Sequence, residues 1–216
     1  MKKWLQMKEP VNTWTHLVTC LAAIVGLILL IIMARHSTSK IITMTIYGVS
    51  VIMLFAASTI YHWAKVTPRK EFILRKIDHI AIYFLIAGSY TPILYYGLEG
   101  RWRSVMLTAV WILALVGLGL ELKFKRIPRA ISTSFYLTFG WLAIIPFWKF
   151  IGTLPMGALV LMFVGGLLYT IGGVIYGTKK LDLFPQKFGF HEIFHIFISL
   201  GTLAHFLMIA IYIVPL

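Results

Sequence analysis

The sequence predicts an all-helical membrane protein built as a bundle of seven transmembrane helices. Of its 216 residues, 60% are hydrophobic and only 12% carry a charge, and the mean hydropathy is +0.88. This composition leaves too little polar surface to cover a water-soluble globule. The apolar residues also form seven long runs, and each run is long enough to cross a hydrocarbon core of about 30 Å as a helix.

The seven runs contain about 20 mainly apolar residues each, which is the length that a spanning helix needs. They extend from Thr15 to Ala34, Ile41 to Tyr61, Ile77 to Tyr96, Ser104 to Leu120, Ile131 to Phe150, Met156 to Tyr176 and His191 to Val214. Strands are excluded because the runs are continuous, whereas a membrane barrel alternates apolar and polar residues. The loops are too short for a second domain, so residues 1–216 are predicted to form one bundle.

Prolines and glycines modify this prediction locally. Pro92 and Pro146 lie inside predicted spans and are expected to kink them. Five glycines in and just after the sixth span are expected to permit close helix approach: Gly165, Gly166, Gly172, Gly173 and Gly177.

The positive charges are distributed unequally between the two ends of the predicted spans. The chain carries 20 Lys and Arg against 7 Asp and Glu, and only five of the basic residues lie on the side opposite the N-terminus: Arg35, Lys40, Arg101, Arg103 and Lys149. Because cytoplasmic loops carry the excess of positive charge, the N-terminus is predicted to be cytoplasmic and the C-terminus outside. Basic loops of this kind contact lipid headgroups, so membrane lipids are the expected partners and nucleic acid is not.

Ionisable residues gather at the ends of three predicted spans. Ser58 and His62 end the second span one helical turn apart, Asp78 opens the third, and His191 and His195 open the seventh one turn apart. Successive spans run in opposite directions, so all three ends lie on the cytoplasmic side. His62, Asp78, His191 and His195 are therefore expected at one depth in the bundle, with Ser58 one turn deeper.

Three imidazoles at one depth are typical ligands of a divalent zinc ion, Zn²⁺, and leave a fourth position for water. A carboxylate such as Asp78 is then available to orient that water or a ligating histidine, and Ser58 to hydrogen-bond to the water or to a substrate carbonyl. The alternative is structural. The helix dipole alone favours His62 at a helix C-terminus and Asp78 at an N-terminus, and paired histidines near an interface also snorkel.

The remaining histidines are interpreted as structural. His16 and His36 lie near interfaces without comparable partners, and His79 is expected to point away from the face of Asp78. His205 is expected either to line the cavity or, as the favoured interpretation, to hydrogen-bond across helices. The single cysteine, Cys20, excludes an intramolecular disulfide.

One short motif suggests a different chemistry. Residues 191–195 read His-Glu-Ile-Phe-His and match HExxH, in which zinc proteases use the glutamate as a base. The chain contains no soluble protease domain, and the topology already supplies a third histidine from another helix. We therefore keep the two histidines as metal ligands and reject the protease assignment. Glu192 is retained only as a candidate for contacting one of the metal-ligating side chains.

Together these motifs resemble the hemolysin III branch of the progestin and adipoQ receptor superfamily, over nearly the whole chain. The matching features are Glu9-Pro10-Val11-Asn12 with His16, Ser58-xxx-His62, Asp78 followed by Gly88-Ser89-Tyr90-Thr91-Pro92, and His191-xxx-His195 with His205. The resemblance implies seven membrane helices with a cytoplasmic N-terminus, in a bacterial plasma membrane.

The resemblance also implies a site and an activity. It implies zinc held by His62, His191 and His195, with Ser58 and Asp78 close to the metal-bound water. Receptor relatives show ceramidase-like hydrolysis, so a metal-dependent hydrolase of lipid amides or esters is the first expectation. The alternative is a non-enzymatic membrane protein with hemolytic or cytolytic activity, or with a role in membrane-energy and lipid homeostasis.

The charge bias makes a prediction about topology. Because 15 of the 20 basic residues lie on the N-terminal side, residues 1–10 are expected in the cytoplasm and Leu216 outside. Reporter fusions at the two ends measure this directly. Signals from the same compartment at both ends would contradict an odd number of spans.

Overall fold

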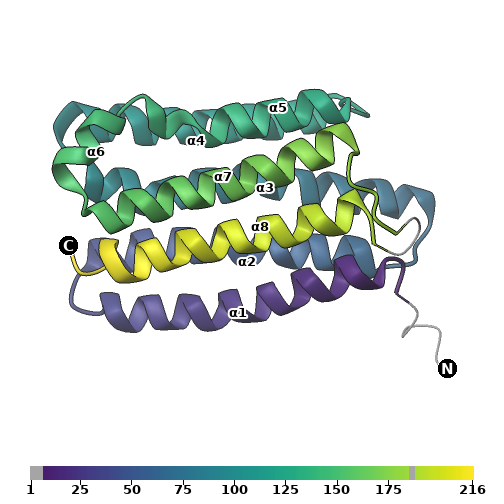
Figure 1. Ribbon diagram of the computed structural model, residues 1–216, viewed down its shortest axis with the longest axis horizontal. Helices are drawn as coiled ribbons and strands as arrows, with labels where there is room; N and C mark the ends of the chain where they lie inside the picture. The colour runs from purple at the N-terminus through teal and green to yellow at the C-terminus, as the bar shows by residue number, and fades with distance from the viewer. Residues whose placement is uncertain (1–6, 185–187) are drawn as a thin grey trace.

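A computed structural model describes residues 7–184 and 188–216, and its long helices run side by side along one axis (Figure 1). The helices are α1 (Pro10–Ala34), α2 (Thr38–Trp63), α3 (Pro68–Gly97), α4 (Gly100–Lys123), α5 (Arg129–Gly140), α6 (Phe147–Thr153), α7 (Met156–Thr178) and α8 (Phe190–Met208). The described residues contain no β-strand, so the predicted all-helical class is confirmed.

Six of these helices are long and apolar enough to cross a membrane, and the bent pair of α5 and α6 brings the number to as many as seven. The start of α1 and the end of the chain lie at opposite ends of the bundle, as an odd number of passes requires (Figure 1). The cytoplasmic side stays a prediction from charge. Three of the lysines counted on the predicted cytoplasmic side lie outside the described residues: Lys2, Lys3 and Lys187.

The third and fifth predicted spans differ most from the observed helices. The helix α3 begins at Pro68, well before the predicted Ile77, because proline at the first helical position and Glu71 in the first turn favour a helix start. The helix also continues through Pro92 without a break. These additional turns carry charged residues beyond the apolar run.

The predicted helix from Ile131 to Phe150 is wrong as a single element. The chain breaks after Gly140, forms one short 3-10 turn at Leu142–Ile144, and bends by 48° before α6. Pro146, which was expected to kink this span, lies at the bend, directly before α6. The Tyr90 hydroxyl donates to the Gly140 carbonyl at 2.5 Å and accepts from the Ala143 N–H at 3.0 Å. A broken helix is tolerated at membrane depth because a neighbouring helix satisfies the freed backbone groups in this way.

Small residues set the approach of α7 to its neighbours. A Cβ at Gly172 would lie 2.8 Å from the Cβ of Phe197 on α8, and a Cβ at Gly173 would lie 3.0 Å from Leu137 on α5. The predicted close approach along α7 is confirmed at these two positions.

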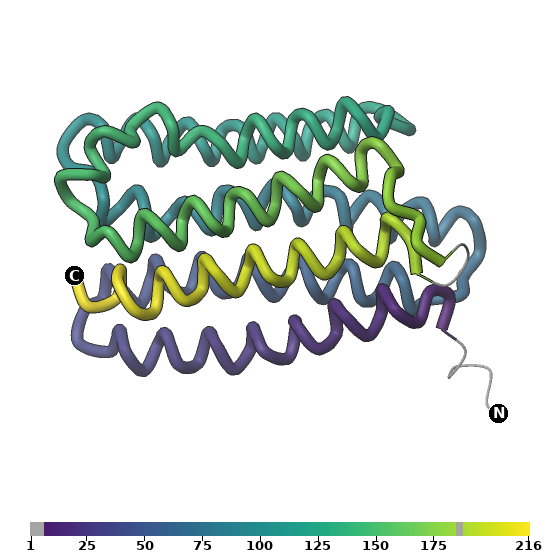
Figure 2. Tube along the Cα trace, in the orientation of Figure 1, coloured from purple at the N-terminus to yellow at the C-terminus, as the bar shows by residue number. Residues whose placement is uncertain are grey.

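The elements that carry the predicted site meet at one end of the bundle. The tube trace shows the start of α1, the connection between α2 and α3, and the start of α8 gathered there (Figure 2). The helix α1 packs against both α2 and α8. This end of the bundle holds the cluster described next.

Candidate metal centre

Three histidines from two helices converge at this end of the bundle. His62 lies in the last turn of α2, and His191 and His195 lie one turn apart at the start of α8. One ring nitrogen from each lies within 4.8 Å of the other two. His62 and His195 are each only 1% exposed. The prediction that these three side chains come together is confirmed, and they form a candidate metal-binding site.

His62 is held by a carboxylate that precedes the first helix. Its Nδ1 lies 2.6 Å from Oε2 of Glu9, and its backbone carbonyl accepts a hydrogen bond from the Glu9 N–H at 3.0 Å. A bond to a carboxylate places the proton on Nδ1 and leaves the lone pair on Nε2. That Nε2 is buried and has no hydrogen-bond partner among the described residues.

This arrangement fits a metal ligand. Histidines that bind metals almost always donate their other ring N–H to a carboxylate or carbonyl, which fixes the tautomer and raises the basicity of the ligating nitrogen. Nδ1 of His195 is likewise buried without a partner in the described chain. The orphaned Nε2 of His62 and its Glu9 contact therefore favour a bound cation over a purely structural cluster.

Glu9 is ionised at neutral pH. Burial raises its pKa, but the hydrogen bond from His62, the positive charge that this ring carries when it is protonated, the Asn12 amide and the Lys8 ammonium together lower it more, to about 2. The carboxylate that faces the cluster therefore carries a full negative charge, which favours a cation on the far side of the His62 ring.

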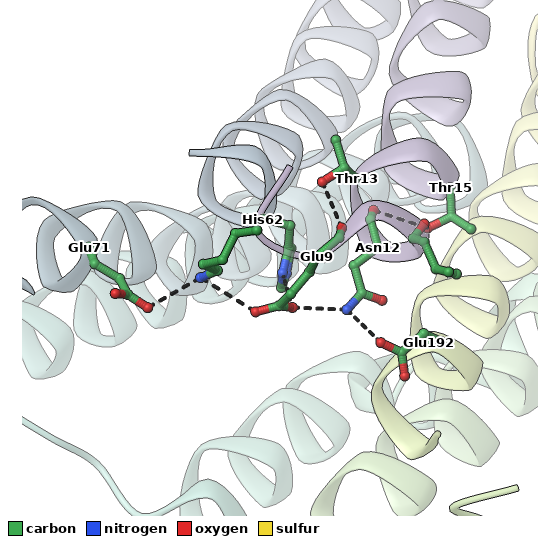
Figure 3. Close-up of polar contacts among 9 residues, drawn as sticks. Glu9, Asn12, Thr13, Thr15, His62, Glu71 and Glu192 are labelled. Carbon is green, nitrogen blue, oxygen red and sulfur yellow. Dashed lines mark hydrogen bonds and ion pairs between the residues drawn. The ribbon is translucent and has the colours of Figure 1, made fainter. Parts of the chain in front are cut away.

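A polar network extends from Glu9 to three other helices (Figure 3). The Asn12 amide donates to Glu9 Oε2 at 3.0 Å and to Glu192 Oε1 at 2.9 Å. Lys8 lies 3.4 Å from Glu9 Oε1 and 3.2 Å from Glu71 Oε1. The segment before α1 thereby connects the ends of α2, α3 and α8 around the histidines.

Glu192 has a structural role in this network. Its Oε2 accepts a hydrogen bond from the Gly189 N–H at 2.8 Å, which caps the start of α8, while Oε1 accepts from Asn12. Both oxygens hold the start of α8 in place, and Glu192 is not among the residues that line the cavity. The geometry agrees with rejecting that assignment.

Ser58 and Asp78 line a cavity together with His191 and His195. Ser58 is buried one turn before His62 on α2, and Asp78 is partly buried on α3. Asp78 was considered as the carboxylate that orients one of the three histidines. Glu9 makes that contact instead, with His62. The roles predicted for Ser58 and Asp78 toward a water molecule or a substrate stay predictions.

The cavity has a volume of about 970 Å³ and extends from the histidine cluster between α3, α5 and α7. Its walls away from the cluster are mainly apolar, with Ile86, Leu137, Phe163 and Ile198 among the lining residues. A volume of this size matches pockets that bury most of a small ligand. The site is therefore polar at one end and suited to an apolar chain at the other.

The interpretation of His16 as a residue without partners is wrong. Its ring is stacked on that of His195, with centroids 3.7 Å apart, and it lines the cavity. His79 also lines the cavity, and its Nδ1 lies 3.4 Å from Glu121 Oε1 on α4. Two alternatives were given for His205, lining the cavity and hydrogen-bonding across helices, and both are observed. His205 lines the cavity, and its Nε2 lies 3.3 Å from the Met162 carbonyl on α7.

Reasoning from the sequence gave Glu9 and Asn12 no individual role. A signal was available, because Glu9, Asn12 and His16 are spaced i, i+3 and i+7 and so lie on one face at the start of a helix. That face is the one turned toward α2 and α8.

Comparison with known proteins identifies the family. The profile of haemolysin-III related proteins matches residues 4–206. The chain belongs to this family. It is 38% identical over 208 residues to a hemolysin-3 homolog of Bacillus subtilis, a match that covers 95% of this chain and 94% of the relative. The resemblance found in the sequence is thus confirmed.

More distant relatives of this haemolysin-III related protein occur in animals. It is 30% identical to human monocyte to macrophage differentiation factor, over 90% of this chain and 80% of that protein. It is 28% identical to an adiponectin receptor protein of Drosophila melanogaster, over 92% of this chain and 49% of the receptor. Family membership and the apolar helices together identify a multi-pass membrane protein, in agreement with a bacterial cell membrane.

The contact between Glu9 and His62 makes a prediction about metal affinity. Glu9→Ala should weaken binding of a divalent metal ion about 10- to 100-fold, because His62 loses the carboxylate that orients its ring. Competition against a metal-binding dye measures the affinity.

Glu71→Ala is the matched control, since Glu71 contacts the same Lys8 but no histidine. Equal affinities in Glu9→Ala and Glu71→Ala would contradict a role for Glu9 in holding the ligand.

Proposed function

We propose that this haemolysin-III related protein is a zinc-dependent hydrolase of membrane lipid amides or esters, similar to a ceramidase. The observation that carries the proposal is the buried, unpartnered Nε2 of His62, oriented by Glu9 beside a cavity with apolar walls. This combination provides a cation site at the polar end of a space that suits a lipid chain.

The ligand set supports zinc and an open coordination position. Imidazole nitrogens suit Zn²⁺, and structural zinc sites have four protein ligands whereas catalytic sites have three. Among the described residues, the group that is close enough to share an ion consists of His62, His191 and His195 alone. Three ligands favour a site that admits water or substrate.

The residues around the ligands have matching roles in the proposed reaction. A zinc ion at this site supplies Lewis acidity, which activates water and polarises a carbonyl oxygen. Asp78 accepts a proton from the attacking water and returns it to the leaving nitrogen or oxygen as the carbon–nitrogen or carbon–oxygen bond breaks. Ser58 donates a hydrogen bond to the carbonyl oxygen or to the water. The products are a fatty acid and an amine or alcohol.

The cavity supports a lipid substrate because its apolar walls stabilise an acyl chain away from water. Burial of apolar surface contributes about 0.8 kcal/mol for each CH₂ group. An acyl chain held between α3, α5 and α7 leaves its carbonyl end near His191 and His195. Binding energy from the chain therefore positions the bond that is to be cleaved.

A second candidate function is non-enzymatic. A relative from Bacillus cereus that is 34% identical over 96% of this chain carries the name hemolysin-3. In this alternative, zinc stabilises a bundle that acts on membranes by lysis or through membrane-energy and lipid homeostasis. The two candidates differ in whether Asp78 is needed once the metal and the fold are intact.

The proposed site predicts about one zinc ion per chain. His191→Ala should remove most of it, because two imidazoles retain zinc poorly in competition with water. Elemental analysis of protein purified with native lipids measures the content, and His36→Ala, which changes an exposed histidine away from the cluster, is the control. Full zinc in His62→Ala, His191→Ala and His195→Ala alike would refute a shared site.

Asp78→Asn separates an enzyme from a binding protein. The variant should keep its zinc, since Asp78 is not in the ligand set, but should hydrolyse lipid amides or esters about 10²- to 10⁴-fold more slowly, because an amide cannot accept the proton. Zinc content, lipid hydrolysis and a lysis or membrane-stress phenotype are measured in parallel. No turnover in the wild type, with the phenotype intact in Asp78→Asn, would decide for the non-enzymatic candidate.

A further inference from the structure

His16 is a buried histidine on the wall of the cavity. It lies on the apolar helix α1 and is only 3% exposed. Its ring is parallel to that of His195 within 15° at a centroid separation of 3.7 Å, and it forms a T-shaped contact with the Phe55 ring at a centroid separation of 4.8 Å. The imidazole is thus fixed in place by aromatic contacts on two sides.

Neither ring nitrogen of His16 has a hydrogen-bond partner among the residues that the structure describes. A buried polar group without a partner destabilises a protein, because it loses its hydrogen bonds to water. A phenyl ring would make the same stacking and edge contacts with no such penalty. The unpaired nitrogens of a residue that lines the cavity therefore indicate a partner supplied by the cavity's contents.

His16 is not placed as a fourth metal ligand. The lone pair of an imidazole lies in the plane of its ring, and the His16 ring lies parallel to that of His195 and stacked over it. An ion in the plane of His195 is therefore offset from the His16 plane by more than the zinc–nitrogen distance of about 2.0–2.1 Å. In agreement, the group of nitrogens close enough to share an ion does not include His16.

We propose that His16 forms a hydrogen-bonding subsite for an uncharged oxygen, a carbonyl or a hydroxyl, on the polar end of a lipid in the cavity. A neutral imidazole offers one donor and one acceptor, which suits both kinds of oxygen. The proposal rests on the proposed function in that the lipid carries an amide or ester. Because His16 is stacked on His195, the subsite lies directly beside the ligand set and places the polar end of the lipid there.

The test compares binding of two probes of similar chain length, N-oleoylethanolamine and the hydrocarbon cis-9-heneicosene, to detergent-solubilised protein. All measurements use the Asp78→Asn background, so that binding is followed without turnover. His16→Phe keeps the aromatic contacts and removes both nitrogens. It should weaken binding of the ethanolamide about 3- to 10-fold, the effect of one net hydrogen bond, and leave the hydrocarbon within twofold.

Zinc content and two controls complete the design. His16→Phe should retain its zinc, and His36→Phe, the same substitution at an exposed position just beyond the C-terminal end of α1, should not change the binding of either probe. Equal weakening of both probes would show that His16 only shapes the cavity and would overturn the proposal. Unchanged ethanolamide binding, or loss of zinc alone, would also overturn it.

A second pair of variants covers a failure of His16→Phe to fold. His16→Gln retains a donor and an acceptor, whereas the similarly sized His16→Leu has neither. His16→Gln should bind the ethanolamide more tightly than His16→Leu, and equal affinities would overturn the subsite. Because binding is measured directly, an absence of hydrolysis in the wild type would refute the proposed function without deciding this result.

Discussion

The hydrogen bond between Glu9 and His62 is the interaction on which the candidate site depends. It joins the segment before α1 to the last turn of α2, and the backbone bond from Glu9 to the His62 carbonyl fixes the same two segments a second time. From Glu9 the network continues through Asn12 to Glu192 at the start of α8. One carboxylate outside the predicted spans therefore contacts one candidate ligand directly and is linked through Asn12 to the helix that carries the other two candidates.

Satisfied and unsatisfied polar groups lie side by side around the histidine cluster. Both oxygens of Glu192 accept hydrogen bonds, and so does Oε2 of Glu9. Nε2 of His62 and both nitrogens of His16 have no partner within the described chain. Low dielectric strengthens a completed network and raises the energy of an open one, so a ligand that hydrogen-bonds to or coordinates these atoms completes the network.

The fold and the histidine cluster follow from the sequence because each depends on local pattern and helix direction. Long apolar runs predict the spans, and alternating directions bring His62, His191 and His195 to one end. The kink at Pro146 was predicted, but the earlier break after Gly140 was missed because average apolarity does not register a turn that Tyr90 on another helix stabilises. His16 was misread because its partner, His195, lies on α8 and not at helical spacing on α1. The pattern of apolar residues along the sequence does not show contacts between segments that are distant in the chain.

The position of the cluster also gives a bound metal ion a structural effect. The helix α1 packs along both α2 and α8, but α2 and α8 make few direct contacts with each other in the described residues. A metal ion held by His62 on α2 and by His191 and His195 on α8 would therefore join two helices that are otherwise connected mainly through α1. Removing a ligand would loosen this end of the bundle as well as empty the site, so loss of function in a ligand variant has two physical explanations. Asp78 and His16 lie on the cavity wall outside the ligand set, and changes there affect the proposed chemistry with that connection intact.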